Sequence, residues 1–135
     1  MISAAAALAL RAEWDGVVRM RERMQTLVCV TFASGAITGP ALAKVVYNLP
    51  LLLAFDVLRQ ALLTARDEGQ FKCRRGQLGD LMDSARSSLS WLDWDSLRAG
   101  VRRRNEVAHD GQLFDSDQCI RDIANVEAQL IAWGM

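Results

Sequence analysis

The side chains best suited to chemistry lie together in residues 101–111. Three arginines, Arg102 to Arg104, stand directly before Asn105, and His109, the only histidine of the 135-residue chain, follows four positions later. Guanidinium groups form charge-assisted hydrogen bonds with phosphate, and imidazole gains or loses a proton near neutral pH. This combination of residue types indicates binding of a phosphate group, with proton transfer at His109.

Residues 94–108 are predicted to form the helix that positions these side chains. At about 100° per residue, the apolar stripe of this helix consists of Leu97, Val101, Arg104 and Ala108, and the adjoining stripe of Arg98, Arg102, Asn105 and His109. An unpaired guanidinium on an apolar stripe is costly, so we expect Arg104 to have an anionic or carbonyl partner or to face a cleft. Arg104 and His109 lie about 140° apart on this ideal helix, whereas Arg102 shares a face with the imidazole.

The sequence from Arg104 to His109, Arg-Asn-Glu-Val-Ala-His, resembles the motif of the HEPN superfamily. That motif is an arginine, four to six residues and then a histidine, with a polar residue, commonly asparagine, directly after the arginine. Arg102, Arg103 and Arg104 all satisfy the spacing. Arg104 is favoured because Asn105 follows it, and Arg102 is the geometric alternative.

The resemblance implies a small all-α domain that dimerises, and many members of the superfamily are metal-independent ribonucleases of toxin–antitoxin and antiphage systems. It therefore implies one domain over residues 1–135, an antiparallel up-and-down bundle of about five helices, that acts as a homodimer on RNA, with an antitoxin protein as a further partner and no cofactor or metal. Catalytic roles would belong to Arg104, Asn105 and His109, and RNA phosphate contacts to Arg98, Arg102 and Arg103.

One position departs from the pattern of the HEPN toxins that pair with minimal nucleotidyltransferases. Those toxins often carry a tyrosine two positions after the histidine, where this chain has Gly111. Control through modification of that tyrosine, and pairing with that type of antitoxin, therefore do not carry over.

A single histidine also predicts a dimeric site, independently of the resemblance. RNA cleavage by its own 2′-hydroxyl needs a base for that proton, an acid for the leaving 5′-oxygen and positive charge on the phosphorane. One imidazole cannot readily do both proton transfers at once. A two-fold dimer would supply two copies of His109 to one cleft.

Two other interpretations of the motif remain open. His109 could instead interact with the last carbonyls of a helix that stops at Gly111, with the arginines complementing the same end of the helix dipole. Alternatively, the chain is a non-catalytic helical dimer that binds a nucleotide, RNA or a protein partner through the same patch.

Composition limits the setting in which these functions could operate. Formal net charge is zero, so any RNA contact must come from a local patch rather than a global cationic field. Cys29, Cys73 and Cys119 are widely spaced and accompanied by one histidine. They indicate neither a zinc site nor a disulfide framework, so we expect a reducing cytoplasm.

The remaining helices are predicted from apolar periodicity. The first is expected to end near Ala33, before a turn at residues 35–40, and the uncharged stretch 26–43 is too polar and broken to span a membrane. A second helical segment is expected to be interrupted at residues 48–50, because proline disfavours helical geometry in the preceding residue. A central helix over 51–65, a loop over 65–77, a helix over 78–89 and a closing helix from Asp115 complete the expected bundle.

Two charged features keep alternative explanations. Asp56 lies inside the apolar central run, where it either pairs with Arg59 three residues later or orients an arginine of the motif. The cluster Lys72-Cys73-Arg74-Arg75 lies in the expected loop. It either contacts a phosphate backbone or is simply solvated.

Overall fold

Five α-helices and one π-helical turn make up the described part of the chain. The computed structural model describes residues 2–33 and 45–135, with the backbone alone for residues 26–33. The elements are α1 (Ala4–Ala33), α3 (Asn48–Asp67), α4 (Leu78–Ala85), α5 (Trp94–Asn105), the π-helical turn η1 (Glu106–Asp110) and α6 (Ser116–Ala132). These ranges contain no strand, so the predicted all-α class is confirmed for them.

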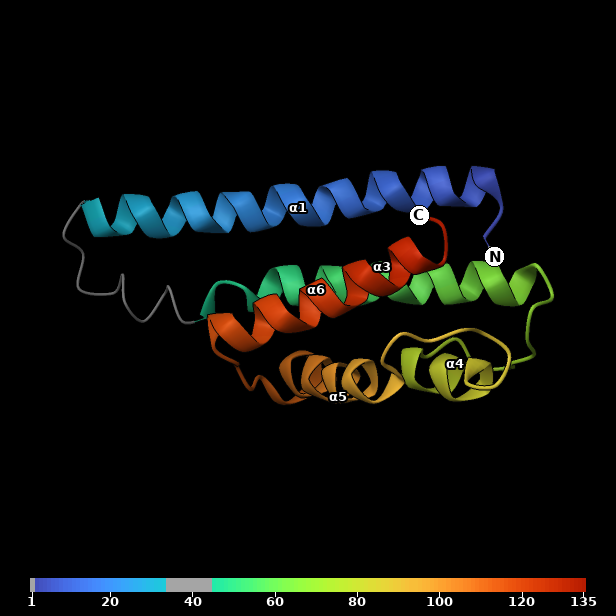
Figure 1. Cartoon of the computed structure of the whole chain (residues 1–135). Helices are drawn as coiled ribbons and strands as arrows, with labels where there is room; N and C mark the ends of the chain where they lie inside the picture. The colour runs from blue at the N-terminus through green and yellow to red at the C-terminus, as the bar shows by residue number, and fades with distance from the viewer. Residues whose placement is uncertain (1, 34–44) are drawn as a thin grey trace.

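Helix α3 is the centre of the fold. It packs against α1, α4, α5 and α6, and Figure 1 shows α3 and α6 between α1 on one side and α4 and α5 on the other. Its fully buried side chains recur at three- and four-residue steps, at Leu51, Phe55, Leu58 and Leu62, as a helix surrounded by others requires. By length and composition α3 could cross a membrane, but 56% of that stretch is buried inside the fold.

The predicted interruption at residues 48–50 is instead the start of α3. The helix begins at Asn48, and Pro50 lies in its first turn, where the backbone N–H it lacks would have no intrahelical acceptor. The next amide, of Leu51, already donates to the carbonyl of Tyr47 at 3.0 Å. The first predicted helix does extend to Ala33, whereas the predicted turn at residues 35–40 lies outside the described residues.

Helix α4 is shorter than predicted, because the chain tightens into three-residue turns after Ala85. The amide of Ser88 donates to the carbonyl of Ala85 at 3.1 Å. The linker that follows is tied to α6 by Gln129, a fully buried side chain. Its amide accepts from the Leu92 N–H at 2.8 Å and donates to the Ser90 carbonyl at 3.1 Å. These bonds fix where α5 begins.

Asp93 starts α5 as its N-cap. Its carboxylate accepts from the Ser96 backbone N–H at 3.0 Å and from the Ser96 hydroxyl at 2.6 Å. These bonds lower the pKa of Asp93. Further along, Gly100 allows α5 to approach the core, since a Cβ there would lie 2.6 Å from the Phe55 ring.

Candidate functional site

The motif segment is not the continuous α-helix that the sequence predicts. Helix α5 ends at Asn105, and Glu106–Asp110 form the π-helical turn η1. The turn closes at Gly111, whose φ of 67° is a left-handed conformation that favours glycine, and whose N–H donates to the Glu106 carbonyl. A π-helical turn forms its hydrogen bonds five residues along rather than four. Side chains five positions apart therefore return towards one face.

This local geometry brings Arg104, Asn105 and His109 together. All three line one open pocket of about 680 Å³, although an ideal α-helix would separate Arg104 from His109 by about 140°. Arg104 thus faces a cleft, one of the two environments expected for it. Because the π-helical turn replaces the last α-helical turn, the face assignments predicted for an ideal helix do not hold at His109.

Arg104 is half-buried and incompletely paired. Its Nη1 donates to Asn105 Oδ1 at 3.2 Å, while its Nε is buried without a hydrogen-bond partner among the described residues. A buried donor without an acceptor costs about 1–3 kcal/mol. Because Nε is enclosed by protein, a ligand in the pocket would contact the Nη groups of Arg104 rather than Nε.

Asn105 and His109 differ in their surroundings. Asn105 contacts the guanidinium of Arg104, so it orients the arginine rather than the imidazole. The imidazole of His109 lies in the exposed part of the pocket wall. Within the described part of the chain it has no hydrogen-bond or ion-pair partner, so both ring nitrogens are accessible to a ligand.

Two further arginines, Arg59 and Arg98, complete the pocket with residues 76–80 at the start of α4. A bidentate pair with Asp83, at 3.1 Å for both bonds, holds the guanidinium of Arg98 beside α4. Arg59 donates from Nε to the Gly76 carbonyl at 2.7 Å. Sequence reasoning missed Arg59, because nothing in the primary structure indicates that α3 reaches this pocket.

Asp56 is close to Arg59 but does not line this pocket. Its carboxylate is 4.0 Å from the Arg59 guanidinium, which is the i, i+3 pair of the first interpretation. Asp56 lines a separate cavity with Glu13 and Val17, between α1 and α3. It therefore does not orient an arginine of the motif.

Arg102 and Arg103 have other environments. Arg102 is exposed and does not line the pocket, so the structure separates it from His109, contrary to the ideal-helix projection. Arg103 forms two 2.7 Å hydrogen bonds with Asp122, a carboxylate with 1% exposure. Those bonds raise the pKa of Arg103 and commit its guanidinium to α6. We therefore leave both arginines out of the candidate site.

A second residue that sequence reasoning missed fixes the chain after η1. The side chain of Asn48 is buried and donates to the carbonyls of Val45 at 2.9 Å and Phe114 at 2.8 Å. Its oxygen accepts from the Phe114 N–H at 3.0 Å. Asn48 thus holds the segment that leaves the motif against the start of α3. The only available signal was an asparagine two residues before a proline, which suggested a break instead.

The cysteines and acidic groups do not add to this site. Among residues 2–25 and 45–135, no group of three or more His, Cys, Asp or Glu side chains is placed to hold a metal ion. Cys119 is buried in the core, and burial raises the pKa of its thiol to about 12. Comparison of the chain with models of protein families, with curated proteins and with solved structures finds no match.

Proposed function

We propose that the protein is a metal-independent endoribonuclease of HEPN type, acting as a homodimer in the cytoplasm. The observation that carries the proposal is the convergence of Arg104, Asn105 and His109 on one pocket through the π-helical turn. These are the motif residues whose types suit phosphate binding and proton transfer. The packed all-α architecture fits a HEPN bundle, with an antitoxin as the partner expected for a toxin of this kind.

In the proposed reaction the RNA strand supplies its own nucleophile. The imidazole of one His109 removes the proton of the 2′-hydroxyl, and the 2′-oxygen attacks the adjacent phosphorus. The bond from phosphorus to the 5′-oxygen breaks, and the second imidazole gives a proton to that oxygen. Arg104, oriented by Asn105, stabilises the charge of the phosphorane. The products are a 2′,3′-cyclic phosphate and a 5′-hydroxyl.

Two exposed leucines are candidates for a dimer contact near the motif. Leu49 and Leu113 are 47% and 54% exposed, and each is adjacent in sequence to a member of the hydrogen-bonded pair Asn48 and Phe114. A dimer contact that covered both side chains would remove their apolar surface from water. A two-fold contact there would bring two copies of His109 towards one another.

The same pocket supports a second candidate function. Three guanidiniums, of Arg59, Arg98 and Arg104, line it against a single imidazole. That ratio also suits a non-catalytic helical dimer that binds RNA or a nucleotide by its phosphates.

Incubation of mixed-sequence RNA with the purified protein in EDTA, beside His109→Ala, tests the ribonuclease proposal. We expect cyclic phosphate ends from the wild type and a rate at least ~100-fold lower from the variant, provided that circular dichroism and light scattering show the same fold and mass. Uncut RNA that nevertheless binds, over a panel including tRNA, would favour the non-catalytic dimer. A monomer that cleaves RNA would contradict the shared site.

A further inference from the structure

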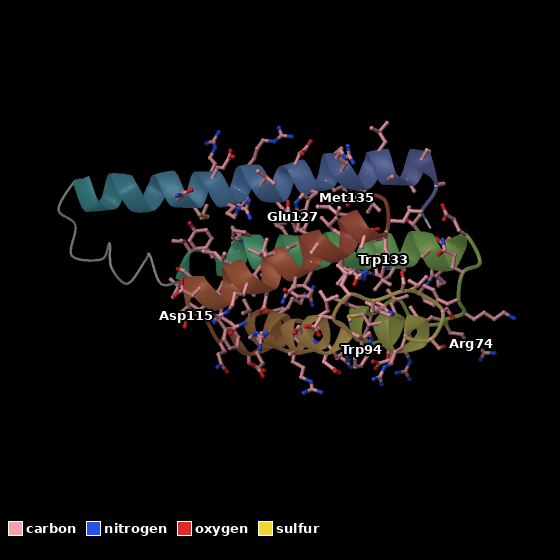
Figure 2. All side chains as sticks on the ribbon, in the orientation of Figure 1. Arg74, Trp94, Asp115, Glu127, Trp133 and Met135 are labelled. Carbon is pink, nitrogen blue, oxygen red and sulfur yellow. The ribbon has the colours of Figure 1, made fainter. Side chains whose placement is uncertain are left out.

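Basic side chains gather around the start of α4 beyond the candidate site. A second cavity, of about 360 Å³, lies beside the first and shares Asp80 with it. Its basic lining comes from residues 72–75, here called the basic loop, which contributes Lys72, Arg74 and Arg75. All three side chains are exposed, and Figure 2 shows Arg74 at the edge of the molecule beside α4.

The two cavities make this face strongly positive on a chain of zero formal net charge. Among the described residues, six lysines and arginines line them but only two carboxylates, Asp80 and Asp83, which leaves a local charge of +4. Asp83 is already paired with Arg98, and Asp80 lies 3.9 Å from Arg75. Within the described residues, Lys72 and Arg74 have no carboxylate partner, so their charge is available to a polyanion.

We propose that the basic loop is a second phosphate-binding surface, which holds the RNA strand on one flank of the phosphate bound at Arg104 and His109. This inference rests on the proposed function. Because the cavities share Asp80, they adjoin, and a strand leaving the first enters the second beside Arg75, which lies 3.9 Å from the Asp80 carboxylate. Lysine and arginine contacts to phosphate position a strand without reading its bases, so the loop strengthens binding irrespective of sequence.

The test is binding of a fluorescein-labelled, fully 2′-O-methylated single-stranded RNA, measured by anisotropy over a range of salt concentrations. This probe lacks the attacking hydroxyl, so binding is measured without cleavage. Lys72→Gln/Arg74→Gln, which removes the two loop charges without a carboxylate partner among the described residues, is compared with Arg11→Gln/Arg23→Gln, a matched loss of two exposed charges on α1. Helix α1 lies across α3 and α6 from the loop (Figure 1). Thermal melts establish that both variants are folded.

We expect the loop variant to raise the Kd about tenfold and to reduce the slope of log Kd against log salt by about 1.4, since single strands lose about 0.7 per phosphate contact. The α1 variant should bind as the wild type does. Equal weakening by both variants, unchanged binding by the loop variant, or no binding by the wild type would overturn the inference.

Cleavage of the unmodified RNA by the same preparations separates this inference from the proposed function. If the wild type cleaves and the loop variant binds normally, the basic loop is not a phosphate surface and the ribonuclease proposal is unaffected. If the wild type binds but never cleaves, and the loop variant binds weakly, the phosphate surface is supported and the ribonuclease proposal fails.

Discussion

Arg103 and Arg104 are neighbours in the chain but belong to two different sides of the same helix. Arg103 faces α6, where its guanidinium is bound to the buried Asp122 by two short hydrogen bonds. Arg104 lines the pocket beside α4, with a buried Nε that has no partner among the described residues. On the α6 side the guanidinium of Arg103 is engaged by Asp122. On the pocket side the guanidinium of Arg104 makes one hydrogen bond, to Asn105, and is free to bind an anion.

The difference separates a structural from a chemical use of the same residue type. A guanidinium paired with a buried carboxylate stabilises the packing of two helices only while both partners are present. A guanidinium that lines a solvent-filled pocket can bind an anion instead. The three consecutive arginines thus do not form one basic patch. Arg102 is exposed, Arg103 contacts α6 and Arg104 lines the pocket.

Removing Arg103 should have the largest effect on stability. Arg103→Gln leaves Asp122 buried with one remaining side-chain donor, Gln118 at 3.2 Å, and we expect the free energy of unfolding to fall by about 3 kcal/mol. Urea denaturation measures it. Arg102→Gln, an exposed neighbour, is the control and should change stability by less than about 0.5 kcal/mol. Equal small losses would show that the pair with Asp122 is not a structural contact.

The two sides should also differ in the reactivity of their cysteines. Burial on α6 raises the pKa of Cys119 to about 12, so its thiolate is scarce at pH 8 and iodoacetamide should modify it at least ~100-fold more slowly than the loop residue Cys73. Because the thiolate fraction still rises below this pKa, the rate at Cys119 should increase about tenfold per pH unit between pH 8 and 10. Peptide mapping by mass spectrometry follows each site. Comparable rates at pH 8 would indicate that the core beside α5 opens readily.

A smaller effect is expected at Gly100, where α5 approaches the core. An added Cβ would lie 2.6 Å from the buried Phe55 ring, so Gly100→Ala should cost about 1–2 kcal/mol in a thermal or urea melt. Gly16→Ala in α1 is the matched control, since nothing lies within 4 Å of its added Cβ. It should stabilise by up to ~1 kcal/mol through helix propensity. A gain at both glycines would mean that α5 is not closely packed there.

The fold was accessible from the sequence where apolar periodicity is strong. The strongly apolar run 51–65 predicts a central helix, and α3 is that helix, with Leu51, Phe55, Leu58 and Leu62 buried. The same reasoning misjudged Pro50, because a proline that disfavours a helix interior is tolerated in a first turn. It also extended α4 too far, since the tight turns after Ala85 depend on the contacts of the linker with α6.

The candidate site was only partly accessible. Residue types and spacing indicate Arg104, Asn105 and His109. The π-helical turn that brings them together was not predicted, because the sequence reasoning assumed a regular α-helix. Arg59 lines the pocket and Asn48 holds the segment after η1, both from α3 by tertiary packing, for which one sequence holds no signal. The partner of Arg103 is a carboxylate nineteen positions away on another helix, which explains why all three arginines looked alike.

The most direct test of the difference between the two sides is the cleavage rate of mixed-sequence RNA in EDTA by Arg104→Gln and Arg102→Gln, each with its thermal melt. The pocket geometry leads us to expect a loss of at least ~100-fold for Arg104→Gln, the size found when one charge-stabilising donor is removed from an active site. Arg102→Gln should stay within about threefold of the wild type, since its exposed side chain does not line the pocket. The opposite ranking, with both variants folded, would contradict the assignment of Arg104 to the site.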